Sequence, residues 1–212
     1  MNNIIRYGSL LMLGMAAFLP TRAMATDSVS PSDVEINFQD LYLSKNTDCS
    51  NPQHVLHNSS NATQNFINSP TLGAGSVPKG TYPCAIVGIY SQITMTPAAS
   101  TTSSTPPACV KGVSVTNQIC RSGGSSVDPA TGATITCVTG TPTEVFGYFS
   151  TTGVASNGGG SGLSPTSPLP LSSALVVTGN HTLHFVVDFD NTMQDFGGGS
   201  SCNTQAPTMS AR

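Results

Sequence analysis

The densest group of side chains that could do chemistry is acidic and lies near the end of the sequence, in D-F-D-N-T-M-Q-D. Asp188 and Asp190 are two residues apart, so in a strand they share one face, and Asn191 and Asp195 follow closely. Oxygen ligands of this kind suit Ca²⁺, although the spacing is not that of an EF-hand loop. We therefore predict a weak calcium site at Asp188, Asp190 and Asp195, with an ordinary solvated strand end as the alternative. No other cofactor is expected.

The histidines form two pairs, His54 with His57 and His181 with His184, each three residues apart. Residues three apart in a regular strand point to opposite faces, so neither pair alone has the geometry to share a metal ion. The two pairs could meet in space. We expect His54 and His57 in a polar loop, and the simpler interpretation is that all four are surface histidines.

Catalytic patterns are absent from the sequence. No G-x-S-x-G motif occurs, and the glycine runs 158–160 and 197–199 do not follow a strand into a helix, as a phosphate-binding loop would. Glu35 and Glu144 are the two glutamates, and nothing in the sequence places either beside an aspartate as a hydrolase would require. These features favour a protein that is not an enzyme, with a secreted hydrolase as the least favoured alternative.

The six cysteines predict three disulfides, because an even count behind an export signal is typical of oxidising compartments. Proximity in the chain favours Cys49–Cys84, together with either Cys109–Cys120 or Cys120–Cys137. Cys202 is the sixth cysteine and holds the C-terminal segment. A zinc site is disfavoured because no C-x-x-C pair exists.

Residues 1–25 resemble a bacterial secretory signal peptide. Arg6 supplies the positive charge, an apolar run of about half a membrane span follows, and Ala23-Met24-Ala25 fits the cleavage rule. No later stretch is apolar enough to cross a membrane, so the sequence predicts an exported protein that is periplasmic, on the outer surface or extracellular. The part after residue 25 has five basic and ten acidic residues, a net charge of −5. Without a basic cluster, nucleic acid and anionic membranes are poor partners.

Alternating apolar runs predict an all-β protein, an antiparallel β-sandwich of seven to eight strands with long Gly/Ser/Thr/Pro-rich loops. We expect a flexible segment at 26–32, one domain at 33–195 and a Gly/Ser-rich tail at 196–212. A change of phase in the first strand predicts a bulge near Gln39 and Asp40. The most apolar run, 82–95, should be the central strand. Gly88 within it marks a close crossing or a bulge. The expected strands are 33–43, 82–95, 110–119 and 133–138 as a hairpin, 143–150, and 173–177 and 182–190 as a second hairpin.

Three segments carry a family resemblance: V-E-I-N-F-Q-D-L-Y-L, then V-P-K-G-T-Y leading into a strand, and finally L-V-V-T-G-N-H-T-L-H-F-V-V-D-F-D. Together they resemble bacterial exported β-sandwich domains of the carbohydrate-binding-like or transthyretin-like kind, whose function is unknown. The resemblance implies fold and location and assigns no functional residue. The expected function is surface binding or adhesion, with a glycan, a protein or another surface as the ligand. The alternative is a self-associating structural subunit of a surface filament or envelope layer.

Overall fold

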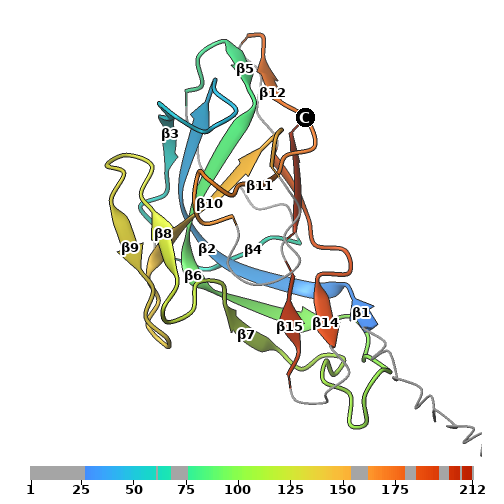
Figure 1. Ribbon diagram of the computed structural model, residues 1–212. Coiled ribbons are helices and arrows are strands. Elements are labelled where there is room, and N and C mark those ends of the chain that lie inside the picture. The colour runs from blue at the N-terminus through green and yellow to red at the C-terminus, as the bar shows by residue number, and fades with distance from the viewer. Residues whose placement is uncertain are drawn as a thin grey trace, which may run out of the picture.

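A computed structural model describes residues 27–60, 62–67, 76–153, 162–179, 185–195, 201–205 and 207–211. Within these ranges the chain is all-β and contains no helix, so none that could span a membrane (Figure 1). The predicted signal peptide at 1–25 lies outside the described residues. The strands are β1 (Asp27–Val29), β2 (Pro31–Ser44), β3 (Gln53–His57), β4 (Gln64–Asn65), β5 (Gly80–Tyr82), β6 (Cys84–Pro97), β7 (Val115–Gln118), β8 (Ser125–Val127), β9 (Thr134–Thr136), β10 (Glu144–Ser150), β11 (Leu169–Pro170), β12 (Leu175–Val177), β13 (Phe185–Asp188), β14 (Met193–Asp195), β15 (Asn203–Thr204) and β16 (Thr208–Ala211).

The central strand is β6, as its apolar sequence predicts. It pairs with β2 along almost its whole length, and β10 and β7 share its other edge. Figure 1 shows β2 and β6 as two long, curved ribbons running side by side through the molecule. The seven-stranded main sheet consists of β2, β3, β4, β6, β7, β10 and β11. Smaller sheets are made by β1, β14 and β15, by β5 and β12, by β13 and β16, and by β8 and β9.

The predicted bulge in the first strand is confirmed. The β2–β6 ladder shifts register on both sides of Phe38, first after Ile36 and again before Asp40. Each inserted residue changes which face the following side chains occupy. The shifts let one strand supply Val34 and Ile36 to one buried cluster and Leu41 to another.

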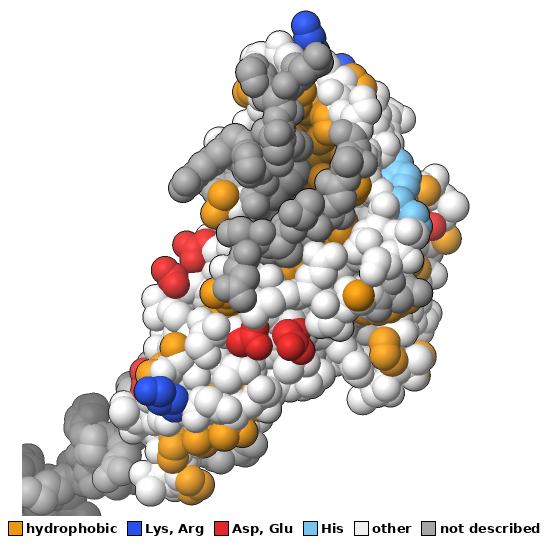
Figure 2. Space-filling view, turned by 180° about the vertical axis from the view of Figure 1, so that it is seen from behind, with side chains coloured by type: hydrophobic (Ala, Val, Ile, Leu, Met, Phe, Trp, Pro, Cys, Tyr) orange, Lys and Arg blue, Asp and Glu red, His pale blue; other side chains and the backbone are white. Residues whose placement is uncertain are grey.

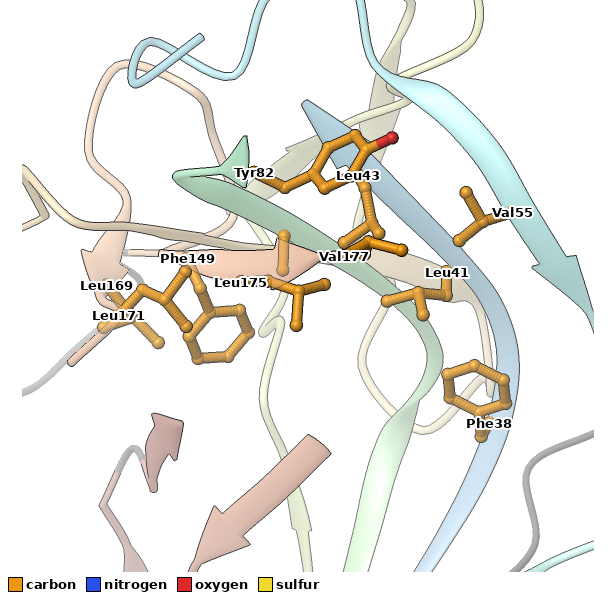
Figure 3. Close-up of a cluster of buried hydrophobic side chains, with 11 residues drawn as sticks. Phe38, Leu41, Leu43, Val55, Tyr82, Phe149, Leu169, Leu171, Leu175 and Val177 are labelled. Carbon is orange, nitrogen blue, oxygen red and sulfur yellow. The ribbon is translucent and has the colours of Figure 1, made fainter. Parts of the chain in front are cut away.

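Two apolar cores lie on one face of the main sheet, and a third cluster lies on the opposite face. Figure 3 shows the upper core, where side chains from β2, β3, β5 and β12 meet. Burying each large apolar side chain contributes about 1.5–3 kcal/mol to folding. The upper core contains Phe38, Leu41, Leu43, Val55, Tyr82, Ala85, Phe149, Leu169, Leu171, Leu175 and Val177. The lower core contains Val34, Ile36, Ile93, Met95, Cys109, Phe189, Met193 and Cys202. The outer cluster, covered by β8 and β9, contains Tyr42, Cys49, Cys84, Ile86, Phe146 and Tyr148.

Neither predicted hairpin forms as expected. Strand β12 pairs with β5, and β13 pairs with β16, so 173–177 and 182–190 do not face each other where they are described. The local turn signal was outweighed by burial, since Leu175 and Val177 complete the upper core only beside β5. Similarly, β7 pairs with β6, while β9 pairs with β8 across a turn in which Asp128 accepts a hydrogen bond from Ala130 N at 2.8 Å.

Strands occur in the segment predicted to be flexible, 26–32, and in the predicted Gly/Ser-rich tail, 196–212. Residues 26–32 include β1 and the start of β2, and 196–212 includes β15 and β16. Strand β14 lies between β1 and β15, so both ends of the chain join one sheet. Composition misled the prediction here, because the glycine and serine content hid short strands whose partners are distant in sequence.

The disulfides are Cys49–Cys84, Cys120–Cys137 and Cys109–Cys202. The first pair was predicted, Cys120–Cys137 was one of two alternatives, and Cys109–Cys120 is wrong. The chain has no free cysteine.

Non-reducing mass spectrometry of the oxidised protein is expected to find three disulfides and no thiol, because every cysteine has a partner. Peptide mapping should recover the Cys109–Cys202 link. Alkylation of any cysteine without prior reduction would contradict this pairing.

Candidate functional site

The predicted calcium ligands are turned to different partners. Asp195 is fully buried, and its carboxylate accepts hydrogen bonds from Thr101 Oγ1 at 3.1 Å and from the Ser104 hydroxyl. Asp188 Oδ1 instead accepts a hydrogen bond from Asp190 N at 2.9 Å. The structure therefore does not bring the three carboxylates together as one ligand set.

A different group of metal-ligand type forms at the edge of the main sheet. His54 Nε2 and His57 Nδ1 lie 2.7 and 2.8 Å from the same oxygen, Oδ1 of Asp40. Among the described residues this is the one cluster of three such groups whose ligand atoms all lie within 4.8 Å of one another. The imidazoles are exposed and form the pale blue patch in Figure 2. His181 and His184, the other predicted pair, lie outside the described residues.

A β-bulge in β3 directs both imidazoles to the same face of the sheet. The β2–β3 ladder pairs Asp40 with His57 and Tyr42 with His54, and its register shifts between these pairs. The extra residue on β3 is Val55, whose side chain is buried in the upper core. This insertion reverses the alternation of the strand, so histidines three apart point the same way. His54 and His57 were expected in a polar loop, and that expectation is wrong.

Aromatic packing orients His54. Its ring stacks on Tyr42, with centroids 4.5 Å apart and planes at 25°. Tyr42 in turn meets the Phe146 ring edge-on, at 6.1 Å. Burial, reinforced by the nearby Asp40 charge, raises the pKa of Tyr42 to about 12, so the phenol stays neutral at physiological pH.

Glu144 on β10 lies beside Asp40 on β2, across the central strand β6. Burial, and then the hydrogen bond to Asp40 and its charge, raise the pKa of Glu144 to about 7. Burial also raises the pKa of Asp40. The hydrogen bonds from Glu144, His57 and His54 outweigh this effect, so the pKa of Asp40 lies below its usual value. The pair thus consists of an ionised Asp40 and a Glu144 that retains its proton more readily than an exposed glutamate.

Gly88 makes room for this carboxyl pair. It lies opposite Asp40 in the β2–β6 ladder and opposite Phe146 in the β6–β10 ladder. A Cβ atom at this position would lie 2.9 Å from Glu144 Oε1 and 3.0 Å from Asp40 Cβ. The close approach predicted at Gly88 is therefore present, and the groups that approach its backbone are Glu144 and Asp40.

A shallow polar groove lies further along the same face of the main sheet. Its volume is about 310 Å³. Strand alternation places it beside the carboxyl pair, because Tyr90 lies two residues beyond Gly88 and opposite Glu144. The groove is lined by Glu35, Asn37, Thr63, Tyr90, Gln92, Thr94 and Pro142.

Period-two alternation could have indicated this surface from sequence. Glu35 and Asn37 alternate with the core residues Val34 and Ile36, and Gln92 is next to Ile93. Polar residues on one face of a strand usually indicate only solvent exposure, and nothing local reveals that β2 and β6 align them beside the loop residues Thr63 and Pro142. The sequence does single out Glu144, yet its neighbour Asp40 comes from a strand about a hundred residues earlier in the chain.

Comparisons with protein-family models, with curated proteins and with solved structures found no match to this chain. The resemblance to exported carbohydrate-binding-like and transthyretin-like domains stays a prediction. Two features of the main sheet bear on function: the groove, and the cluster of Asp40, His54 and His57, called the Asp40 cluster.

Proposed function

We propose that the protein is an exported, non-catalytic binding protein that recognises carbohydrate through the polar groove of its main sheet. The observation that carries the proposal is the lining of the groove. One carboxylate, two amides and two threonine hydroxyls surround a tyrosine and a proline. Such a set offers both donors and acceptors to the hydroxyl groups of a sugar.

The aromatic and apolar members of the groove complete the match to a sugar. Tyr90 and Pro142 supply the surface on which the C–H face of a pyranose packs, while Gln92 and Asn37 supply planar amides. The groove is open and of modest volume, which suits one or two sugar units of a chain that continues into solvent. The acidic net charge of the part after residue 25 disfavours a phosphate-rich polymer as ligand.

The carboxyl arrangement supports binding rather than hydrolysis. Glycosidases place two carboxyl groups about 5–9.5 Å apart, on either side of the bond that they cleave. Glu144 and Asp40 lie close together over Gly88, which leaves no room for a sugar between them. Glu35 is the single carboxylate that lines the groove.

Export belongs to the same proposal. Three disulfides are compatible with an oxidising compartment, and the leader pattern at 1–25 gives the route. We place the protein in the periplasm, on the outer surface or outside the cell.

A glycan array probed with the oxidised protein is expected to give hits that weaken in the variant Y90A/Q92A. Each lost contact of this kind contributes about 1 kcal/mol, so the double change should raise Kd by about tenfold or more. The matched control is Gln53→Ala, an exposed glutamine outside the groove. Kd would be measured by titration of the best array hit.

Two results would overturn the proposal. One is an empty array together with unchanged surface attachment in a deletion strain. The other is filaments in negative-stain micrographs whose formation is insensitive to Y90A/Q92A, which would favour the structural-subunit alternative.

A further inference from the structure

We propose that Asp40, His54 and His57 bind a divalent transition metal ion of the Ni²⁺, Cu²⁺ and Zn²⁺ group, with Glu144 as the supporting carboxyl group. This site is separate from carbohydrate recognition, since none of the four residues lines the groove. The proposal rests on three observations: the three ligand atoms lie close together, the two imidazoles are free to shift, and the buried Oε1 of Glu144 has no hydrogen-bond partner.

The three ligand atoms lie close to the separation that a metal requires. Zinc binds imidazole nitrogen and carboxylate oxygen at about 2.0–2.2 Å, which puts neighbouring ligand atoms of a tetrahedral site about 3.3 Å apart. His54 Nε2 and His57 Nδ1 lie 2.7 and 2.8 Å from Asp40 Oδ1, and all three atoms lie within 4.8 Å of one another. Admitting an ion requires shifts of about half an ångström.

The imidazoles are free to make that adjustment, while the carboxylate is fixed. The side chains of His54 and His57 are 44% and 58% exposed, whereas that of Asp40 is 10% exposed. The bulge in β3 already directs both rings to the same side, so the backbone need not move. The stack of Tyr42 on His54 limits the orientation of that ring. An ion at this position would reach solvent and complete its coordination with water.

The donor set selects the class of metal. Imidazole nitrogen suits zinc, copper and nickel, whereas calcium and magnesium prefer oxygen ligands throughout. Two imidazoles and one carboxylate therefore favour the first group. The calcium site predicted from Asp188, Asp190 and Asp195 is a different site, and calcium is not the ion that the Asp40 cluster favours.

Glu144 gives the second observation. Its Oε1 atom is buried and has no hydrogen-bond partner in the structure. Buried acceptors without a donor are rare and call for a proton, a water or an ion nearby. Through Asp40, Glu144 is in the position of the outer carboxyl groups that orient and strengthen metal ligands. Gly88 is the residue whose missing side chain permits this approach.

Isothermal titration calorimetry of tag-free, oxidised protein with Zn²⁺, and separately with Ni²⁺, tests the site. One ion per chain is expected, and Ca²⁺ should give no heat at the same concentrations. H54A/H57A should abolish binding of both ions. Glu144→Gln should raise Kd by about tenfold, the usual effect of losing an outer carboxyl partner.

Controls separate this site from other ligands. H181A/H184A removes the second histidine pair and should leave Kd unchanged. Circular dichroism checks that each variant is folded, and Asp40→Asn, which keeps the shape of the side chain, provides a second ligand test. Electron paramagnetic resonance of the Cu²⁺-loaded protein should show coupling to two nitrogens, and to none in H54A/H57A.

Absence of Zn²⁺ and Ni²⁺ binding by the wild-type protein would overturn the proposal. So would binding that H54A/H57A and Asp40→Asn leave intact, or that H181A/H184A abolishes. Each of these outcomes is distinct from failure of the glycan array, because no groove residue is altered.

Discussion

Replacing Cys109 and Cys202 together with alanine is expected to lower the free energy of unfolding by about 2–5 kcal/mol. The two cysteines are 93 residues apart, so their bond restricts a large part of the unfolded chain. Both are buried in the lower core with Met95 and Met193, where they also contribute packing. Urea denaturation of the oxidised variant measures the loss.

The matched comparison is the double variant C120A/C137A, whose cysteines are 17 residues apart. If the length of the loop that a disulfide closes in the unfolded chain sets the stabilisation, C120A/C137A should lose about 1–2 kcal/mol less free energy of unfolding than C109A/C202A. Hydrogen exchange should speed up in β14 and β15 of C109A/C202A, because Cys202 lies directly before β15. Equal losses from the two variants, with unchanged exchange, would contradict this account.

Substituting Asp195 with alanine is expected to cost about 3 kcal/mol, the sum of a few hydrogen bonds to a charged acceptor and the donors left unsatisfied. Its carboxylate accepts hydrogen bonds from the hydroxyls of Thr101 and Ser104, and from Ala108 N at 3.3 Å. These contacts join β14 to the segment that leads into Cys109. Equilibrium urea denaturation of the two proteins measures the difference.

Two further variants make the Asp195 prediction specific. Asp195→Asn keeps the volume and one acceptor oxygen, so its loss should be smaller than that of the alanine variant. Asp190→Ala removes an exposed aspartate from the same region and should change stability by less than about 0.5 kcal/mol. A full-sized effect of Asp190→Ala, or none in Asp195→Ala, would show that the buried hydrogen bonds do not hold this segment.

Regular alternation made the long strands predictable. Strands β2, β6 and β10 carry enough period-two or continuous apolar residues to be located from sequence, and the bulge in β2 follows from its change of phase. The short strands were not predictable in this way. Strands such as β4, β5 and β16 have two to four residues, and distant partners define them more than their own composition.

The Asp40 cluster was hidden for a geometric reason. The sequence around His54 and His57 predicts a polar loop. Their common direction depends on one inserted residue in β3, Val55. Strand β3 has five residues, too few to show the change of phase that reveals the bulge in β2. Asp40 sits among apolar residues, and its significance depends on Gly88 and Glu144, which are far away in sequence. Predicting the site would have required the register of two ladders.

The Cys49–Cys84 bond has a consequence for the order of folding. Strands β2 and β6 must find each other across some forty residues of intervening chain, and such non-local pairing is slow. Ser44 lies opposite Cys84 at the end of that ladder, and Cys49 is only five residues beyond Ser44. Once oxidised, this pair holds the two strands at one end in the correct alignment, so that the rest of the ladder closes progressively from it. Formation of this disulfide thus gives the main sheet a fixed end from which it can assemble.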